Sequence, residues 1–398
     1  MDRYLHDVAE RLIACDTVSH RTNEPIVGLL ADELDRLGFA VALQAHDERG
    51  VRKVNLVARL GPPEPDGLIL SGHLDVVPFE GQPGWTRDPL ALVADGDRLY
   101  GRGTCDMKGF VAQCLAAARR LDRASLERPL VFVFTCDEEI GCLGAERLAP
   151  ALAALLGELP MPGLCWIGEP TDWRVAYAHK GIVQLDVVAH GRGGHSSLPE
   201  AGVNAIALAA RAVAAIGEVQ ASERARPDER WRATFPDAPY TTFNFGTIAG
   251  GTASNVIAET CRLRVSYRPL PGGDPLAAHA QVAARLAALE PRDWGSPDQR
   301  GAIELLPPRV VPGLCSPRGT ELEKTLRAVL GDHEPGGAPF CTDGGRLAAV
   351  GIASLICGPG ELAQAHQPDE SLPRAAFERG PDVILDVLAR LLGARRSD

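Results

Sequence analysis

The sequence predicts an α/β protein in which a mostly parallel-sheet domain carries an inserted ferredoxin-like α+β domain. Short apolar runs alternate with amphipathic stretches in the first and last parts of the chain, which is typical of a sheet flanked by helices. Between them, strands of alternating polarity and helices follow the order β-α-β-β-α-β, the pattern of a ferredoxin-like fold. With 398 residues, 45% of them hydrophobic, the chain is long enough for two domains. We expect residues 1–180 and 310–398 to form the larger domain and residues 181–309 to form the insertion.

The larger domain is predicted from strands that are almost entirely apolar, as expected when helices cover both faces of a sheet. These strands are Val54–Leu60, Leu68–Leu74, Leu130–Thr135, Cys165–Ile167 and Ala353–Cys357. Helical spacing predicts a first helix with Leu5, Val8, Leu12 and Ile13 on one face, and further helices over Phe110–Leu121, Leu143–Leu156 and Asp382–Leu392. The segment GPPEPDG, residues 61–67, predicts a surface turn between two strands.

The insertion is predicted from strands in which apolar and polar residues alternate. Such strands have one face in water and one face packed on helices. The expected elements are a strand over Val183–His190, a helix over Val203–Val219, strands over Thr241–Ile248 and Cys261–Arg268, a helix over Pro275–Leu289 and a short strand over Ala302–Leu306. A polar segment, residues 221–239, separates the first helix from the second strand.

Composition narrows the class of protein. The chain has 41 Lys and Arg against 52 Asp and Glu, a net charge of −11, so it lacks the basic excess that nucleic-acid binding favours. No apolar run approaches the ~20 residues that cross a bilayer, and the N-terminus lacks the basic start and apolar stretch of a signal peptide. Ten cysteines include no C-x-x-C pair. We therefore expect a cytoplasmic protein with reduced thiols and no membrane or nucleic-acid partner.

Histidine and carboxylate residues recur just after the predicted strands and in glycine-rich loops. They are His73 and Asp75 in SGHLDVVP, Asp106 in GRGTCDMKG, Asp137, Glu138 and Glu139 in FTCDEEIG, Glu169 in WIGEPT and His366 in AQAHQPDE. Taken singly, each motif is also compatible with a structural role, such as a satisfied histidine, a plain turn or a solvated acidic loop. Their joint occurrence therefore matters more than any one motif.

Together, these residues predict a metal site. The carboxyl ends of parallel strands meet at one edge of a sheet, where α/β proteins bind ligands. Mixed imidazole and carboxylate ligands suit zinc, cobalt or manganese, and about five ligands with one shared carboxylate suit two cations ~3.5–4 Å apart. Three successive carboxylates repel one another unless cations or solvent absorb the charge. One glutamate could then bind a metal while its neighbour faces a bound water.

The ordered motifs resemble those of the co-catalytic metallopeptidase and deacylase family, which includes acetylornithine deacetylase, succinyl-diaminopimelate desuccinylase, aminoacylases and glutamate carboxypeptidases. The similarity runs through GHLDVVP, GRGTCDMKG, DEEIGCLG, GEPT, GRGGHSS and CGPGELAQAHQPDE, and so covers nearly the whole chain. Within the family, DEEIGCLGA and the CGPG and QAHQPDE strings look most like the acetylornithine deacetylases. The resemblance implies a metal-binding catalytic domain with an inserted lid and dimerisation domain.

The resemblance also implies a ligand set for two divalent metal ions, with zinc expected first and cobalt as the alternative. Asp106 would bridge both ions. His73 and Glu169 would complete one site, and Glu139 and His366 the other.

Two further residues of the same motifs have implied roles. Asp75 would orient His73, and Glu138 would be the general acid and base. The family often has a cis peptide after the bridging aspartate, which here is Asp106–Met107.

The resemblance assigns the remaining candidates to substrate binding and to the oxyanion. His195 in GRGGHSS matches a lid histidine that donates to the oxyanion, often across a dimer interface. Asn255 and Arg268 lie at positions that the family uses for substrate, and Arg268 would bind the α-carboxylate through its planar guanidinium. Thr342, in CTDGG (341–345), would line the pocket from the larger domain.

The sequence thus leads to one favoured function and two alternatives. The favoured function is metal-dependent release of acetate from N-acetyl-L-ornithine in arginine biosynthesis, by a homodimer that pairs through the inserted domain. A broader N-acyl-amino-acid amidohydrolase, a succinyl-diaminopimelate desuccinylase-like enzyme or a dipeptidase is the alternative among enzymes. A metal-binding protein without turnover is the alternative from another class, and the intact Glu138 argues against it.

Overall fold

The computed structural model describes residues 2–289 and 301–397. The chain divides into two compact units. Unit 1 consists of Met1–Ala178 and Cys315–Asp398, and unit 2 consists of His179–Leu314. The expected boundaries at residues 180/181 and 309/310 compare with observed boundaries at 178/179 and 314/315.

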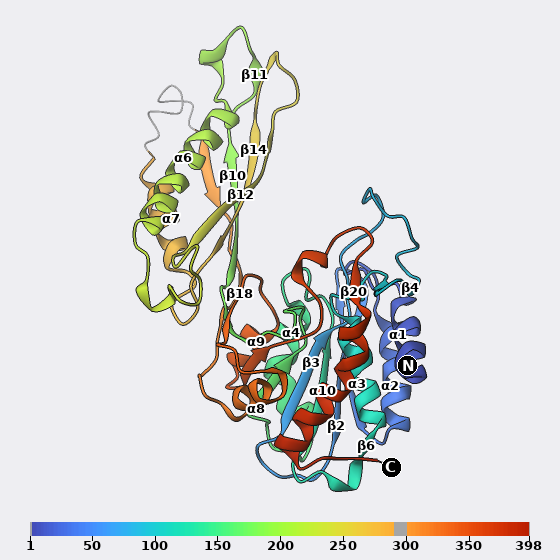
Figure 1. Ribbon diagram of the computed structural model, residues 1–398. Coiled ribbons are helices and arrows are strands. Elements are labelled where there is room, and N and C mark those ends of the chain that lie inside the picture. Colours follow the sequence, from blue (N-terminus) through green and yellow to red (C-terminus); the bar gives the residue numbers. More distant parts are fainter. Residues whose placement is uncertain (1, 290–300, 398) are drawn as a thin grey trace. The chain divides into compact units, whose positions relative to one another are not determined.

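A nine-stranded sheet forms the centre of unit 1 (Figure 1). Its middle contains four mutually parallel strands in the order β7-β3-β8-β19, with bounds Leu130–Thr135, Leu68–His73, Leu164–Ile167 and Ala353–Ile356. Antiparallel strands extend the sheet on both sides. They are β1 (Ala40–Glu48) and β2 (Val51–Leu60) beyond β7, and β9 (Ala176–His179) beyond β19, with the short β17 (Leu314–Cys315) and β18 (Gly336–Ala338) next to β9. The predicted mostly parallel sheet is confirmed for this central part.

Helices cover both faces of the sheet, which explains its apolar strands. The first face packs against α1 (Arg3–Ile13), α2 (Glu24–Arg36), α3 (Lys108–Arg119), α8 (Glu321–Leu330) and α10 (Arg374–Leu392), and the second against α4 (Leu143–Leu148), α5 (Leu152–Leu156) and α9 (Gly344–Ala348). Successive residues of one strand therefore enter different cores. Phe132 and Phe134 of β7 enter the first core, while Val131 and Val133 enter the second.

Two predicted helices differ from the observed ones because of proline. The expected helix Leu143–Leu156 is interrupted by a 3₁₀ turn, Ala149–Ala151, that contains Pro150. The expected last helix begins earlier, at Arg374, because Pro381 lies inside α10 instead of marking its start. Small strands complete unit 1, namely β4 (Val93–Asp95), β5 (Arg98–Tyr100) and β20 (Ser371–Pro373) in one sheet, and β6 (Leu121–Asp122) with β21 (Arg395–Arg396) in another.

Unit 2 has the predicted ferredoxin-like order of elements. They are β10 (Ile182–His190), α6 (Ala205–Arg224), β12 (Thr242–Gly250), β14 (Thr260–Arg268), α7 (Ala277–Ala287) and β15 (Ala302–Leu305). The strands pair antiparallel in the order β12-β14-β10-β15, and β16 (Arg309–Val311) also pairs with β10. A separate pair, β11 (Gly194–His195) with β13 (Val256–Ile257), lies beyond the end of this sheet at which His190 faces Thr260 (Figure 1).

Helix α6 qualifies the prediction that no segment could cross a membrane. Among the described residues it alone has the length and apolar composition for a span. Its Leu208, Ala212 and Ile216 are buried against the sheet of unit 2. We therefore interpret its apolar character as packing within the domain.

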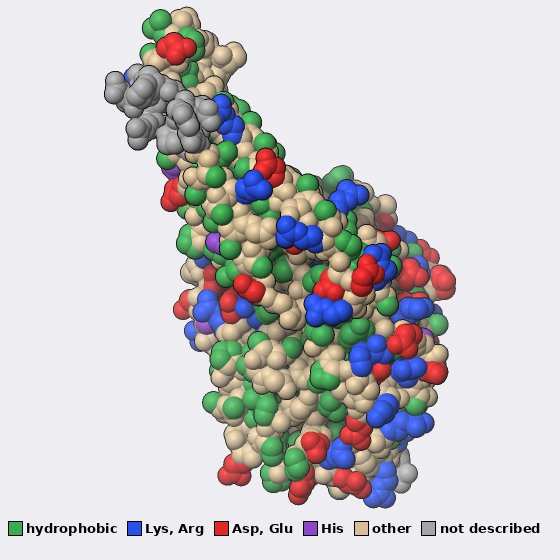
Figure 2. All heavy atoms as spheres, turned by 90° about the vertical axis from the view of Figure 1, so that its left-hand side faces the viewer, with side chains coloured by type: hydrophobic (Ala, Val, Ile, Leu, Met, Phe, Trp, Pro, Cys, Tyr) green, Lys and Arg blue, Asp and Glu red, His purple; other side chains and the backbone are tan. Residues whose placement is uncertain are grey.

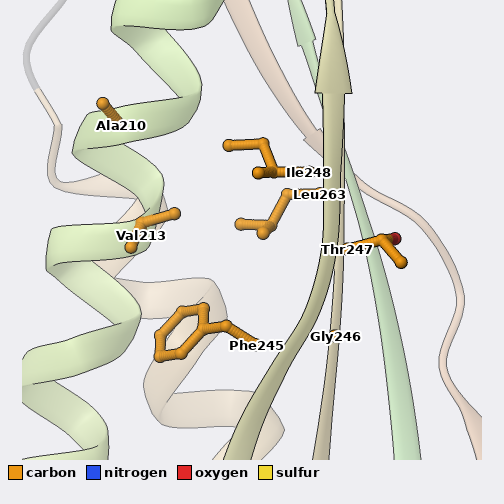
Figure 3. A pocket seen from close by; sticks show the side chains of 7 residues that line it. All are labelled: Ala210, Val213, Phe245, Gly246, Thr247, Ile248 and Leu263. Atoms are coloured by element: carbon orange, nitrogen blue, oxygen red, sulfur yellow. The ribbon is translucent and has the colours of Figure 1, made fainter.

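An apolar hollow of about 400 Å³ lies between α6 and β12 (Figure 3). Phe245 and Ile248 both point toward α6, although residues three apart on a regular strand face opposite sides. A shift of register between Phe245 and Thr247 explains this, because the extra residue is Gly246 in a β-bulge. Ile248 is 54% exposed in the single chain.

Charged side chains of both signs are interspersed over the face of the protein shown in Figure 2.

Candidate metal centre

Four of the predicted metal-binding side chains lie just past the carboxyl ends of the parallel strands or in the loop before α3. His73 is the last residue of β3, and Glu139 follows β7 by four residues. Glu169 follows β8 by two residues, and Asp106 precedes α3. The fifth, His366, lies in the loop after β19. Parallel pairing aligns these ends, so the topology brings together residues that are far apart in sequence.

Asp106 lies between two histidines. Its Oδ1 is 2.9 Å from His73 Nε2, and its Oδ2 is 3.3 Å from His366 Nε2. His73 Nε2 is also 3.8 Å from a Glu169 oxygen, and His366 Nε2 is 3.0 Å from a Glu139 oxygen. The five residues thus form two groups that share one carboxylate.

The His73 ring is oriented by backbone. Its Nδ1 lies 2.9 Å from the carbonyl oxygen of Asp75, while the Asp75 carboxylate is 3.7 Å away. A donating Nδ1–H leaves the Nε2 lone pair directed at the cluster, as a metal ligand requires.

The Asp75 carboxylate instead positions the loop after β7. It accepts hydrogen bonds from the backbone N–H groups of Glu138 and Glu139, at 3.0 and 3.2 Å. The hydroxyl of Ser19 donates to it at 2.7 Å. Asp75 therefore fixes the two glutamates, a contact that sequence reasoning did not foresee.

Glu370 holds the loop that carries Asp106. Its Oε1 accepts from the backbone N–H groups of Gly103, Cys105 and Asp106 at 2.9–3.0 Å, and Arg102 donates to its Oε2 at 2.7 Å. The Asp106–Met107 peptide is cis, as the resemblance implied. Glu370 ends the quoted QAHQPDE string, so its position was visible in the sequence although its contacts were not.

The charges in the cluster are strongly coupled. Burial and the charge of Asp106 raise the pKa of Glu139 to about 7. Burial raises the pKa of Asp106, but hydrogen bonds from His366 and His73 outweigh burial and leave that pKa well below its usual value. Contacts with Asp106 and Glu139 raise the pKa of His366 to about 10. These pKa shifts indicate that the carboxylates of the site are stabilised by positive charge placed between them.

This donor set fits a pair of divalent cations. Imidazole nitrogens and carboxylate oxygens are ligands for zinc-like metals, and ligand atoms of His73, Asp106 and Glu139 lie within 4.8 Å of one another, as do those of His73, Glu138 and Glu169. Three ligand carboxylates and Glu138 supply four negative charges, which two divalent ions would neutralise.

Glu138 is half-buried beside the cluster. Burial and the charge of Glu169 raise its pKa well above the usual value for a glutamate. The Cys142 thiol lies 3.4 Å from its Oε1, and ligand atoms of Glu138, Cys142 and the buried Asp343 lie within 4.8 Å of one another. Sequence reasoning did not single out Cys142 or Asp343, although both lie in quoted motifs.

In unit 2 the structure brings His195 and Asn255 together. His195 pairs with Val256 across the β11–β13 ladder, and the backbone N–H of Ser196 donates to the Asn255 carbonyl at 3.1 Å. The exposed His195 accepts at Nδ1 from the Ser197 N–H and lies 2.7 Å from the Ser197 hydroxyl. In the neutral ring, this leaves Nε2 as the donor.

Arg268 lies at the other end of the same sheet. It is the last residue of β14, whose first residue, Thr260, faces His190 near the β11–β13 pair. Since a strand rises ~3.3 Å per residue, the nine residues of β14 separate its ends by roughly 26 Å. Arg268 Nη1 is buried without a hydrogen-bond partner among the described residues. The structure does not bring Arg268 close to His195 or Asn255 within unit 2.

Thr342 is fully buried in unit 1. Its hydroxyl accepts from the Gly344 N–H at 3.0 Å, at the start of α9. It is next to Asp343, so the CTDGG segment does lie beside the metal centre.

A cavity of about 330 Å³ in unit 1 is lined by segments that adjoin the loops of the metal centre. Its lining includes Pro170, which directly follows Glu169, and Glu361, whose carbonyl is 3.5 Å from the Cys105 thiol. Val175 and Phe340 supply apolar wall. Three carboxylates and one guanidinium add charge to the lining, from Asp172, Arg174, Glu334 and Glu361.

Known proteins share both sequence and fold with this chain. The family described as Peptidase family M20/M25/M40 matches residues 69–390. An acetylornithine deacetylase from Erwinia tasmaniensis is 36% identical over 376 residues, 94% of this chain and 93% of that protein. One from Proteus mirabilis is 37% identical over 367 residues, 92% of this chain and 89% of that protein.

Solved structures show the same fold at lower identity. An M20 family metallo-carboxypeptidase from Sulfolobus solfataricus aligns with a TM-score of 0.78 at 17% identity, covering 98% of this chain and 99% of that one. A tripeptidase from Staphylococcus aureus aligns with a TM-score of 0.74 at 22% identity, covering 98% of both chains.

The fold and the clustered histidines and carboxylates define a metal-dependent amidohydrolase. More particularly, the chain belongs to peptidase family M20/M25/M40. The resemblance inferred from the motifs is thereby confirmed.

Proposed function

We propose that the protein hydrolyses N-acetyl-L-ornithine to L-ornithine and acetate, a reaction of arginine biosynthesis, in the cytoplasm. One observation carries the proposal. The residues that resemble the family's ligands and base lie in one cluster, in a chain 36% identical over 94% of its length to a protein named acetylornithine deacetylase. Asp106 would bridge two metal ions, His73 and Glu169 would hold one, and Glu139 and His366 the other.

Zinc is the proposed metal and cobalt the alternative. When bound, the metal pair lowers the pKa of a water molecule and polarises the amide carbonyl. Glu138, whose carboxylate lies against this cluster, would accept the proton of the attacking water and then deliver it to the leaving amine. Its raised pKa supports this role, because a base that also acts as an acid must hold the proton between the two steps.

Arg268 would bind the substrate α-carboxylate. A planar guanidinium can donate two parallel hydrogen bonds to a carboxylate, and the buried Nη1 without a partner is a donor available for this purpose. Asn255 and Thr342 remain proposed substrate residues, Thr342 through its segment because its own side chain is buried.

His195 would donate Nε2–H to the oxyanion, and we propose that it does so in the second subunit of a homodimer. An N-acetyl amino acid is far shorter than the roughly 26 Å that separates the ends of β14. One substrate therefore cannot contact Arg268 and His195 of the same unit 2. A partner subunit's His195 removes this conflict.

The inserted unit offers a surface for that pairing. Strand β12 ends the order of its sheet, and the exposed Ile248 lies beside the apolar hollow next to it. We expect Ile248→Lys to shift the protein from dimer toward monomer in analytical ultracentrifugation.

The charges that line the cavity next to Pro170 favour a substrate with a cationic side chain. The Glu334 carboxylate is paired with Arg318 at 2.7 Å, whereas Asp172 and Glu361 have no ion pair among the described residues. With Arg174 also present, the unpaired side chains of the lining carry one net negative charge. One ammonium group, such as that of ornithine, would balance it.

The test is acetate release by the zinc- or cobalt-loaded enzyme from a panel of N-acyl amino acids. We expect the highest kcat/KM for N-acetyl-L-ornithine, above that for the neutral N-acetyl-L-norleucine. Preference for N-succinyl-diaminopimelate, for dipeptides or for neutral N-acyl amino acids would contradict the substrate and favour the broader alternatives. No turnover of any amide by a protein with two bound metals would favour a binding protein.

A further inference from the structure

A second group of metal-ligand side chains includes the two residues that directly precede Glu138 in the chain. It consists of His46 in β1 and of Cys136 and Asp137, which directly follow β7. One ligand atom from each lies within 4.8 Å of the other two. None of the three belongs to the metal pair described above.

Polar atoms in this group are buried without partners. Among the described residues, neither Nδ1 nor Nε2 of His46 has a hydrogen bond, although both atoms are shielded from solvent. Asp137 is fully buried, and its Oδ2 also has no partner. Because an unpaired buried polar atom costs free energy, three such atoms in one group call for a ligand.

The existing contacts of Asp137 and Cys136 with the described residues leave Asp137 Oδ2 unused. Lys53 Nζ donates to the other Asp137 oxygen, Oδ1, at 2.6 Å, and also to the carbonyls of Ser19 and Arg21. Cys136 Sγ lies 3.3 Å from Asn55 Oδ1, an oxygen that already accepts the Cys136 N–H at 3.0 Å. If the thiol lost its proton, Asn55 Oδ1 would therefore keep the hydrogen bond from the Cys136 N–H.

We propose that His46, Cys136 and Asp137 bind a third divalent cation, of the zinc class. Imidazole, thiolate and carboxylate form a ligand set of tetrahedral zinc, with a water in the fourth position. The metal would displace the thiol proton of Cys136, which passes to solvent, and form one bond each to sulfur, nitrogen and oxygen. The two anionic ligands would offset the charge of the metal, and Lys53, which keeps its contact with Asp137, would leave the group with one net positive charge.

The neutral charge of His46 and its place near the surface support this site, whereas burial raises the pKa of the Cys136 thiol, so the metal itself must displace that proton. Burial, with the nearby charge of Arg147, lowers the pKa of His46, so its ring is neutral and able to bind metal. His46 is only half-buried, on the edge strand of the sheet, so the group lies near the protein surface. A cation here would tie β1 to the segment that leads into Glu138 and Glu139.

Cobalt provides a direct test that needs no substrate. The metal pair has no sulfur ligand, so a sulfur-to-cobalt charge-transfer band reports only a thiolate site. The first measurement is the absorbance of the metal-free full chain during titration with CoCl₂. The second is the amount of zinc bound per chain, determined by mass spectrometry after dialysis against ZnCl₂. The expected result is three metals per chain and a charge-transfer band that grows with the third equivalent.

Substitutions of the proposed ligands test which residues give rise to the charge-transfer band. Cys136→Ala should lose the band and the third metal, and His46→Gln, on the half-exposed edge strand, should weaken the third equivalent by ~10-fold or more. Both should keep two metals, which also reports that they are folded. The matched control is Cys142→Ala, which removes the thiol beside Glu138 and should keep the band.

The outcomes that overturn the proposal are distinct. Two metals per chain and no band in the unaltered protein would refute the third site. A band that survives Cys136→Ala and disappears in Cys142→Ala would assign the metal to the Glu138, Cys142 and Asp343 group instead. Neither outcome depends on which amide the enzyme hydrolyses.

Discussion

The metal centre of unit 1 and the lid residues of unit 2 are built on opposite principles. In unit 1, parallel strands end at one edge, and His73 and His366 both come within hydrogen-bond distance of the carboxylate of Asp106. In unit 2, an antiparallel sheet carries His195 near one end and Arg268 at the other. The first arrangement completes a site within one chain, whereas the second cannot.

The difference between these two arrangements indicates which of the proposed catalytic residues one subunit can supply to one active site. Ligands and base come from a rigid sheet edge, where pairing fixes their distances. His195, the proposed oxyanion donor, and Arg268, the proposed ligand of the substrate carboxylate, are separated by a strand length of roughly 26 Å, so within one chain they would serve two different substrates. In the proposed function a homodimer would therefore complete the active site, and the following predictions test that proposal.

The largest expected effect is at Glu138. Glu138→Gln should lower kcat by ~10²–10⁴-fold, because the amide cannot take the proton of the attacking water, while two metals stay bound. Acetate release and metal analysis of the same sample measure both. The matched control is Glu139→Gln, in which we expect metal to be lost as well. A Glu138→Gln protein with more than a tenth of the original kcat would remove Glu138 as the base.

The next prediction distinguishes an active site formed by one chain from an active site formed by residues of two chains. His195→Ala should lower kcat by ~10²–10³-fold through loss of an oxyanion donor. When inactive His195→Ala and Glu138→Gln chains are unfolded and refolded together, half of the dimers should be mixed, each with one complete site, so about a quarter of the activity should return.

Activity that stays at the level of the separate variants after mixing would place His195 and Glu138 of one chain in the same site. Size-exclusion chromatography of differently tagged chains serves as the control that mixed dimers have formed.

A smaller effect is expected at Arg268. Arg268→Lys keeps the charge but loses the forked geometry, and a charged hydrogen bond of ~1.5–3 kcal/mol corresponds to ~10–150-fold in kcat/KM. Most of the change should be in KM. Arg264→Lys is the control, since the exposed Arg264 on the same strand pairs with Asp186 at 2.8 Å. Equal kinetics for the two variants would exclude Arg268 from substrate binding.

The smallest effect concerns pH and metal affinity. In the metal-free protein, the pKa of His366 is about 10 and that of His73 is well above its usual value, so both rings carry protons at neutral pH. Metal binding must displace these protons, so affinity should fall as pH falls, by about tenfold per pH unit for each proton released. Calorimetry in buffers of different ionisation enthalpy counts the protons, and a pH-independent affinity would contradict the charge coupling.

The central fold was predictable because its strands carry a strong signal. Strands β3, β7, β8 and β19 are buried on both faces, so their apolar runs appear directly in the sequence. Strand β1 is partly exposed on an edge, and β17 and β18 have two and three residues, so their patterns are too weak to predict. The antiparallel direction of β2 follows from the short turn 61–67, which leaves no room for a crossover helix.

The ligand types were visible in the motifs, but the contacts that support them were not. The carbonyl of Asp75 and the carboxylate of Glu370 act through backbone hydrogen bonds that connect residues far apart in sequence. The Cys142 thiol reaches Glu138 only because the loop turns back on itself, with Cys142 at a positive φ of 55°. Such contacts depend on loop geometry, which residue patterns do not encode.

The most direct test of the account is the position of metal ions in crystals of the zinc-loaded enzyme, located by anomalous scattering at the zinc edge. The account predicts two peaks ~3.5–4 Å apart, each ~2.0–2.2 Å from an oxygen of Asp106. His73 and Glu169 should contact one peak, and Glu139 and His366 the other. A single peak, or two peaks that do not share Asp106, would contradict the proposed metal centre.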